Sequence, residues 1–351
     1  EGIGKKPAEI APEPEQKKAP EGAPRKGIPI KGLAVGEFAV TKGTLLWIDR
    51  TRGERKEIAD LNLRLQDVSL DRPIRLVLTA MLDGRPIEVK ANVGPVGKEP
   101  GKGTLPLEIT LKALKELEIA FKGKLVDPAT NQQYDLAVQV SPFSPRSLMS
   151  TLGLDFPVKT TDPKALGKVA LKAHLKGDPK KVSISEGVLQ LDESSLAFSM
   201  KARDFDSPNL AFDLNLDKID LDRYLPPPSE EKPAGKKKGT KPEKKKTDYT
   251  PLRRLVLEGK IRVGELKVRG ARLQDIYLKV VGKNGLFNLD PFSLKLYQGD
   301  LSSTAALDVR RDVPRSKMAL QAEGIQVNPL LKDLLKKDII EGTLKATMNI
   351  A

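Results

Sequence analysis

The sequence contains no cysteine and only one histidine among its 351 residues. Without cysteine the chain can form neither a disulfide nor a thiolate nucleophile, and metal sites built from cysteine and histidine are excluded. Aromatic residues make up only 4% of the chain, fewer than a ligand pocket lined by rings would need. The composition predicts no cofactor and leaves the redox compartment open.

Long hydrophobic runs are also missing. The longest stretch without a charged residue is 136–145, whereas a helix that crosses a bilayer needs about 20 apolar residues. No signal peptide is recognisable. Because the chain starts at Glu1 and stops at Ala351 within an apolar alternation, we expect it to be a fragment of a longer protein.

The charge balance is strongly basic, with a net charge of +14. Segment 226–251 holds eight lysines and four acids and so contributes +4 (8 − 4). Its lysine-rich part, 232–246, has no aromatic residue, so it lacks the stacking groups of a nucleic-acid site. We predict no nucleic-acid partner. A solvated tether and a weak contact with anionic lipid head groups both remain open.

Composition also predicts the domain organisation. Residues 1–26 have almost no large apolar side chains and are expected to be a disordered tail. Residues 226–251 read as a Lys/Pro-rich linker. We therefore expect one β unit at 27–225 and a second at 252–351, which is truncated at its C-terminal end.

Apolar residues at every second position recur along both predicted units, as in Ile74, Leu76 and Leu78. This period is typical of strands with one apolar face, and Gly, Pro, Asn and Asp separate the runs as an antiparallel meander requires. Fifteen or more strands are expected. Only 144–153 and 328–337 resemble helices, with Ser144 and Asn328 as their N-caps.

Two short helices cannot cover so many half-apolar strands. The apolar faces must pack on a second sheet or enclose an apolar ligand. The first solution is a β-sandwich, and the second is a curled, twisted antiparallel sheet that forms an elongated open groove for acyl chains. Composition alone does not separate them.

Catalytic and metal sites are poorly supported. His174 alternates with Lys172 and Lys176 on the polar side of a predicted strand, so we expect an exposed histidine without the orientation that a catalytic triad needs. Oxygen ligands could come from Asp217, Asp220 and Asp222, but their spacing lacks the features of a calcium loop. The glycine-rich segment 97–104 departs from phosphate-loop spacing and leads into a strand. We predict no metal site and no enzyme.

Three segments carry recognisable motifs, which are VTKGTLLWIDRTRGE at 40–54, LDKIDLDRYLP at 216–226 and the segment 255–308. These segments resemble the AsmA family of bacterial envelope proteins. The first is similar to an early hairpin of that family, in which Gly43 turns into a strand ending at Asp49, and the other two are similar to later motifs. The resemblance covers residues 28–351. Its motif residues are expected to be architectural, and they are Gly43, Asp222, Tyr224, Gly285, Pro291, Tyr297 and Gly299. We expect the hydroxyls of Tyr224 and Tyr297 to lie in water. Gly285 and Gly299 are expected at tight turns or close backbone contacts.

The resemblance implies a periplasmic location and attachment to the inner membrane through an N-terminal anchor missing from this chain. It also implies phospholipid transport to the outer membrane, outer-membrane biogenesis and similarity to bridge-like lipid transfer proteins. The expected partner is a phospholipid or another acyl-chain lipid, while protein partners are unknown. The alternative is a structural or protein-interaction β-sandwich module of the envelope.

The residues expected to line the groove belong to the alternating apolar runs. They are Leu76, Leu78, Leu107, Ile109, Ile119, Phe121, Val138, Leu171, Phe198, Phe212, Leu214, Leu278, Val280, Leu294 and Leu296.

Overall fold

The computed structural model describes residues 34–49, 54–227, 248–336, 338 and 340–351, and the side chains of 34, 48, 49 and 54–56 are not described. The predicted tail at 1–26 lies outside these ranges. All described elements belong to one unit, Gly32–Ala351.

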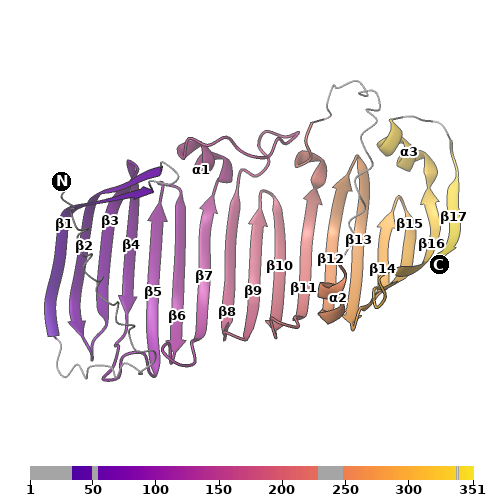
Figure 1. The fold of residues 1–351 in the computed structure, drawn as a ribbon. Helices are drawn as coiled ribbons and strands as arrows, with labels where there is room; N and C mark the ends of the chain where they lie inside the picture. Colours follow the sequence, from indigo (N-terminus) through magenta and orange to yellow (C-terminus); the bar gives the residue numbers. More distant parts are fainter. Residues whose placement is uncertain (1–33, 50–53, 228–247, 337, 339) are drawn as a thin grey trace, which may run out of the picture. The chain divides into compact units, whose positions relative to one another are not determined.

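Seventeen strands account for most of the described residues, and they follow one another in chain order across a single sheet (Figure 1). Each strand pairs with the next one in the sequence, and β1 and β17 are the two outer strands. The prediction of a mainly β, open sheet with few short helices is confirmed. The strands are β1 (Ala34–Asp49), β2 (Glu54–Ser69), β3 (Ile74–Leu82), β4 (Arg85–Val93), β5 (Thr104–Ala113), β6 (Leu117–Val126), β7 (Gln133–Phe143), β8 (Val169–Asp178), β9 (Lys181–Leu191), β10 (Ser194–Arg203), β11 (Asn209–Asp220), β12 (Val256–Val268), β13 (Ala271–Lys283), β14 (Leu286–Leu296), β15 (Gly299–Asp308), β16 (Arg315–Gln326) and β17 (Thr343–Ile350).

One pair of neighbouring strands is parallel. β11 and β12 run in the same direction over eleven residue pairs, from Asn209 with Val256 to Asp220 with Lys267. A parallel pair requires a connection that returns the chain to the edge where it started, and the predicted linker lies in that connection. The two predicted β units therefore share one continuous sheet.

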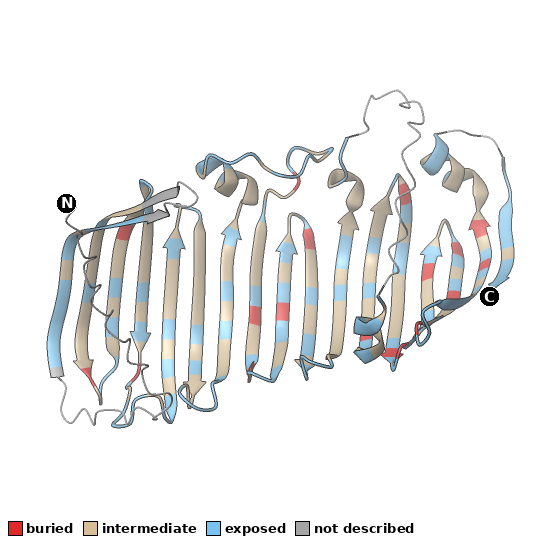
Figure 2. Cartoon of the chain, in the orientation of Figure 1, coloured by how far each residue is buried: buried red, intermediate tan, exposed pale blue. Residues whose placement is uncertain are grey.

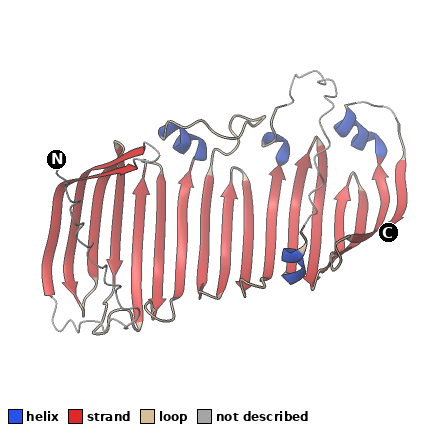
Figure 3. Ribbon diagram, viewed as in Figure 1, coloured by secondary structure: helices blue, strands red, loops and turns tan. Residues whose placement is uncertain are grey.

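The helices lie at the ends of strands (Figure 3). α1 (Pro145–Thr151) follows β7, the 3-10 helix η1 (Leu221–Arg223) follows β11, α2 (Thr250–Arg254) precedes β12, and α3 (Val327–Leu335) follows β16. None of these described helices is both long and apolar enough to cross a membrane. Neither η1 nor α2 was expected from the sequence.

One of the two N-cap residues predicted from the sequence is confirmed, and the other is wrong. Ser144 caps α1 as predicted, since its hydroxyl accepts from the Ser147 N–H at 3.2 Å. The prediction of Asn328 as the cap of α3 is wrong, because Gln326 holds that position. Backbone carbonyls of Tyr297 and Gly342 accept the N–H groups of residues 326 and 327, so two of the free donors at this helix start are satisfied by backbone atoms.

Few side chains in the described part of the sheet are fully buried (Figure 2). Among all described residues, Ile325 and Val309 are the largest fully buried side chains, and alanines are five of the eight buried hydrophobic residues. The β-sandwich alternative is wrong for the described part of the chain, because its strands form one sheet without a second packed layer. The apolar side of that sheet consequently meets no protein core.

Candidate functional site

The apolar residues of neighbouring strands lie directly opposite one another. Leu76 of β3 faces Ala91, Ala91 faces Ile109, Ile109 faces Phe121, and Phe121 faces Val138. Directly paired residues lie on the same side of a sheet, so these five form one row across β3 to β7. We call the side that carries this row and the parallel rows beside it the apolar face.

The other candidate groove residues continue the apolar face through the later strands. Leu78 and Ile119 belong to a row that reaches Leu171, and Phe198 starts a row through Leu214 and Leu278. The remaining candidates pair within the same face: Leu107 with Val93, Phe212 with Met200, Val280 with Leu289, Leu294 with Leu301, and Leu296 with Leu273. Fourteen of the fifteen candidates are half-buried, and Leu294 is buried.

Glycines on this face lie beneath aromatic rings. A Cβ atom at Gly187 would come within 2.7 Å of the Phe198 ring, and one at Gly259 within 2.1 Å of the Phe212 ring. Both glycines are the direct cross-strand partners of those phenylalanines. The rings therefore lie over the neighbouring strand, and the glycines leave room for them.

A third pair of this type joins Phe287 to Gly282, where the added Cβ would be 2.2 Å from the ring. The alternation in the sequence identified Phe198 and Phe212, but the glycines opposite them were missed. Only the pairing of distant strands shows that each glycine accommodates a ring.

Polar contacts gather where β9, β10 and η1 meet the segment before β8. The Asp192 carboxylate accepts the backbone N–H groups of Leu166, Gly167 and Lys168 at 2.9–3.0 Å, and the Tyr224 hydroxyl at 2.8 Å. Burial raises the pKa of Asp192, but these four donors outweigh burial and leave the pKa below its usual value.

Tyr224 is therefore bound to a carboxylate, and the prediction that its hydroxyl lies in water is wrong. Burial and the hydrogen bond to Asp192 raise the pKa of Tyr224 well above its usual range. The same correction applies to Tyr297. Its hydroxyl donates to Asp333 of α3 at 2.7 Å, and burial together with that bond raises the pKa to about 12. Both hydroxyls join separate parts of the chain.

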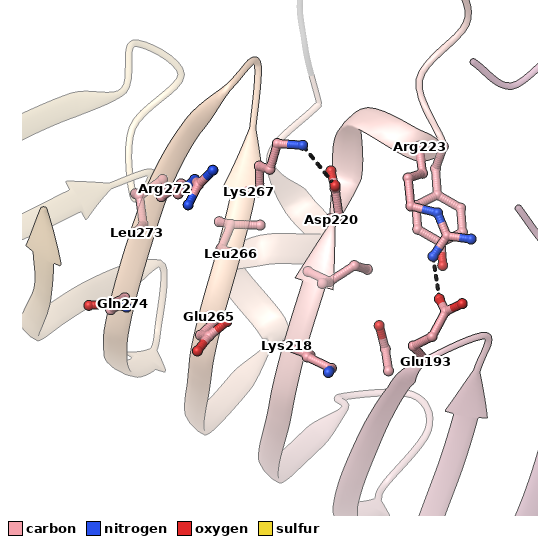
Figure 4. A pocket seen from close by; sticks show the side chains of 13 residues that line it. Glu193, Lys218, Asp220, Arg223, Glu265, Leu266, Lys267, Arg272, Leu273 and Gln274 are labelled. Carbon is pink, nitrogen blue, oxygen red and sulfur yellow. Dashed lines mark hydrogen bonds and ion pairs between the residues drawn. The ribbon is translucent and has the colours of Figure 1, made fainter. Parts of the chain in front are cut away.

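A cleft of about 540 Å³ lies at the adjoining ends of β11, β12 and β13 (Figure 4). Two pairs of its charged side chains contact each other, since Lys267 reaches Asp220 at 2.9 Å and Arg223 contacts Glu193. Arg223 also bonds Asp162 at 2.7 Å. These pairs tie the strand ends together.

The three aspartates considered as metal ligands also have structural partners. Asp217 accepts the Ser195 N–H at 2.8 Å, and Asp222 accepts the backbone N–H groups of Arg269 and Gly270 in the β12–β13 turn. No group of three or more histidines and acids within the described residues could hold a metal ion. The structural interpretation of these aspartates is supported.

His174 has a partner that the sequence did not reveal. Its Nε2 lies 2.5 Å from Oδ1 of Asp135 on the neighbouring strand β7, and this hydrogen bond lowers the pKa of Asp135. Ser185 lies opposite His174 on β9, yet no hydrogen bond joins these two side chains among the described contacts. The imidazole side chain is 40% exposed, so it lacks the shielding of a catalytic base.

The motif glycines are architectural in two different ways. Gly285 adopts φ +74°, and Gly299 has an ordinary φ but lies against the backbone of residues 323–325. Gly43 was expected to turn into a strand. It instead lies within β1, at an irregularity in the pairing with β2, while the strand ends at Asp49 as predicted. Pro291 lies at a similar irregularity between Leu289 and Phe292.

The sequence that forms this sheet was compared with the sequence profiles of known families. The sequence profile of the AsmA family matches residues 114–351. The chain belongs to the AsmA family. Membership supports association with the bacterial cell envelope. The match leaves out the hairpin resemblance at 40–54, which stays a prediction. Searches of curated proteins and of solved structures returned no match.

Proposed function

We propose that this AsmA-family chain is a periplasmic, lipid-binding segment that holds acyl chains along its apolar face without catalysis. In the full-length protein it would be attached to the inner membrane and would take part in moving phospholipid to the outer membrane and in outer-membrane biogenesis. The partner is a phospholipid or another acyl-chain lipid.

The continuous apolar face carries this proposal. Its rows extend from Phe38, Leu65 and Leu76 at one end of the sheet to Leu320 and Met348 at the other. With neighbouring strands about 4.8 Å apart, seventeen strands offer a surface on the order of 75 Å long. A contiguous apolar surface of this size on a soluble protein marks a binding site.

The energetics suit a ligand without specific polar groups in its tail. Burial of one CH₂ group contributes about 0.8 kcal/mol, so a sixteen-carbon chain could gain on the order of 10 kcal/mol before ordering costs. The side chains offered are aliphatic residues and flat phenylalanine rings, which bind tails by shape and area. Selection among lipids would then depend on head groups at the edge of the sheet.

The absence of catalysis is part of the proposal. Several of the described acids and bases at the strand ends are engaged in structural pairs, such as Asp192 with Tyr224 and Lys267 with Asp220. The N–H groups within the sheet serve strand pairing, so few donors remain to stabilise an oxyanion.

Photo-crosslinking from matched positions on the two faces of the sheet tests the proposal. A photoreactive amino acid is placed at Ile109 or Phe121, which face each other on the apolar side, and as controls at Glu108 or Lys122, which face each other on the opposite side. The 351-residue chain is incubated with phospholipid vesicles and irradiated. We expect lipid adducts by mass spectrometry at 109 and 121 and few at 108 and 122.

Two outcomes would count against lipid binding. Equal labelling of both faces would show unspecific contact. A chain that purifies without lipid and acquires none from vesicles would overturn the proposal and favour the alternative of a protein-interaction module.

A further inference from the structure

A second concavity, of about 410 Å³, lies beside the turns that join β8 to β9 and β10 to β11. Two cross-strand rows run through it. Ser183 pairs with Lys201, which pairs with Ala211, and Lys181 pairs with Arg203, which pairs with Asn209. These residues alternate with Val182 and Ala202 of the apolar rows, so their side chains belong to the opposite, polar face.

Four cations line this concavity: Lys176, Lys181, Lys201 and Arg203. Two of them form ion pairs with acidic neighbours, since the ammonium nitrogen of Lys176 lies 3.6 Å from Asp135 and that of Lys181 lies 3.6 Å from Asp178. The two lysine side chains are 73% and 69% exposed, so these pairs are weak.

Lys201 and Arg203 have no carboxylate within 4.0 Å in the described part of the chain. Four cations and two acids therefore leave a local charge of +2 (4 − 2). Lys181 and Arg203 are direct cross-strand partners, an arrangement of like charges that destabilises a sheet.

A neutral group positions Arg203. With its amide oriented to accept, the Asn209 side-chain oxygen lies 3.1 Å from Nη2 and 3.2 Å from Nε of Arg203. The amide fixes the guanidinium without cancelling its charge. Ser183 and Ala211 flank Lys201 with small side chains, which leaves space between the cations, and the Ser183 hydroxyl can donate into that space.

We propose that this concavity binds a phosphate group through Lys176, Lys181, Lys201 and Arg203. Such a group is carried by the head group of an anionic phospholipid or by a soluble phosphate compound. The charge-assisted hydrogen bonds that these side chains supply fit the tetrahedral oxygens of phosphate. The site lies on the face opposite the acyl-chain proposal and stands independently of it.

The test compares two double variants of the full chain that lose the same charge. K201Q/R203Q removes the two unpaired cations, and K172Q/K260Q removes two lysines of the polar face, Lys172 and Lys260, that do not line the concavity. Binding is measured by calorimetry with inorganic phosphate and with glycerol 3-phosphate, and by flotation with phosphatidylglycerol or phosphatidylcholine vesicles.

We expect K201Q/R203Q to weaken phosphate binding at least about tenfold and the control to retain it. Loss of binding to phosphatidylglycerol vesicles in the same variant identifies a lipid head group as the source, whereas loss confined to the soluble compounds identifies a soluble phosphate. Equal losses in both variants, or no phosphate binding by the unmodified chain, would overturn the proposal. Unchanged lipid crosslinking at Ile109 in K201Q/R203Q separates this site from the apolar face.

Discussion

Single carboxylates at the strand ends hold segments that are far apart in the sequence. Asp192 joins residues 166–168 to Tyr224, and Asp222 fixes the turn between β12 and β13. An ionised carboxylate that accepts several N–H and O–H donors is strongly favoured over a neutral group at the same position. These residues replace part of the stabilisation that a packed core would provide.

Asp192→Asn tests this role. The amide offers one accepting oxygen and turns an NH₂ group toward backbone donors, so we expect the free energy of unfolding to fall by about 3 kcal/mol at pH 7. Urea unfolding followed by circular dichroism measures the loss. Asp206→Asn is the control, because Asp206 is exposed in a turn and its substitution should change stability by less than about 0.5 kcal/mol.

The effect of Asp192→Asn should depend on pH. The pKa of Asp192 is lower in the folded chain than in the unfolded one, so protonation favours unfolding. The stabilisation is complete above about pH 4 and is lost as the pH falls through the folded-state pKa. The difference in the free energy of unfolding between the unmodified chain and Asp192→Asn should therefore shrink as the pH falls below about 4. A difference that stayed constant would contradict a role for the ionised carboxylate.

At the scale of elements, close approaches of backbone decide how strands and helices meet. A Cβ at Gly299 would lie 2.3 Å from the Ile325 nitrogen and 2.5 Å from the Glu323 oxygen. A Cβ at Gly270 would lie 2.6 Å from the Asp333 oxygen in α3. These glycines allow α3 and the end of β16 to lie against the β12–β13 and β14–β15 turns.

Gly299→Ala should therefore be strongly destabilising, since the atoms in contact are backbone and cannot move aside as a side chain could. We expect a loss of about 3 kcal/mol, measured by thermal and urea unfolding. Gly36→Ala is the matched control within a strand, because a Cβ there meets nothing within 4 Å. Equal stability of both variants would show that the close contact at Gly299 is unimportant.

At the scale of the whole molecule, the described chain has one layer where most β proteins have two. Apolar side chains on the apolar face remain accessible, including Phe38 at 49% and Met200 at 39%. A sheet of this kind gains stability from whatever covers that face, because a ligand that binds only the folded state stabilises it by mass action.

Short-chain phospholipid below its micelle concentration should raise the melting temperature of the purified chain. At about 100 times Kd the stabilisation is about 2.7 kcal/mol, which corresponds to roughly 5 °C. Glycerophosphocholine, which has the head group without tails, is the matched control and should raise the melting temperature less than the phospholipid does. Equal shifts with both compounds would argue against binding through acyl chains.

The sequence by itself determined the strands, their two faces and the family. Alternation is a local property, because successive side chains of a strand point to opposite sides, so Leu76 and Leu78 could be placed on one face without knowledge of their neighbours. The cap of α1 was also predictable, since Ser144 and the N–H that it accepts are three residues apart.

Only the tertiary structure decided how the strands assemble and what their polar residues contact. The sequence could not choose between a sandwich and an open sheet, because the same alternation of apolar and polar side chains is compatible with both. It could not show that Asp135 meets His174, that Gly259 lies beneath Phe212, or that Tyr224 is bonded to Asp192. These partners are 39, 47 and 32 residues apart (174 − 135, 259 − 212 and 224 − 192), and strand pairing, which depends on the whole sheet, brings them together.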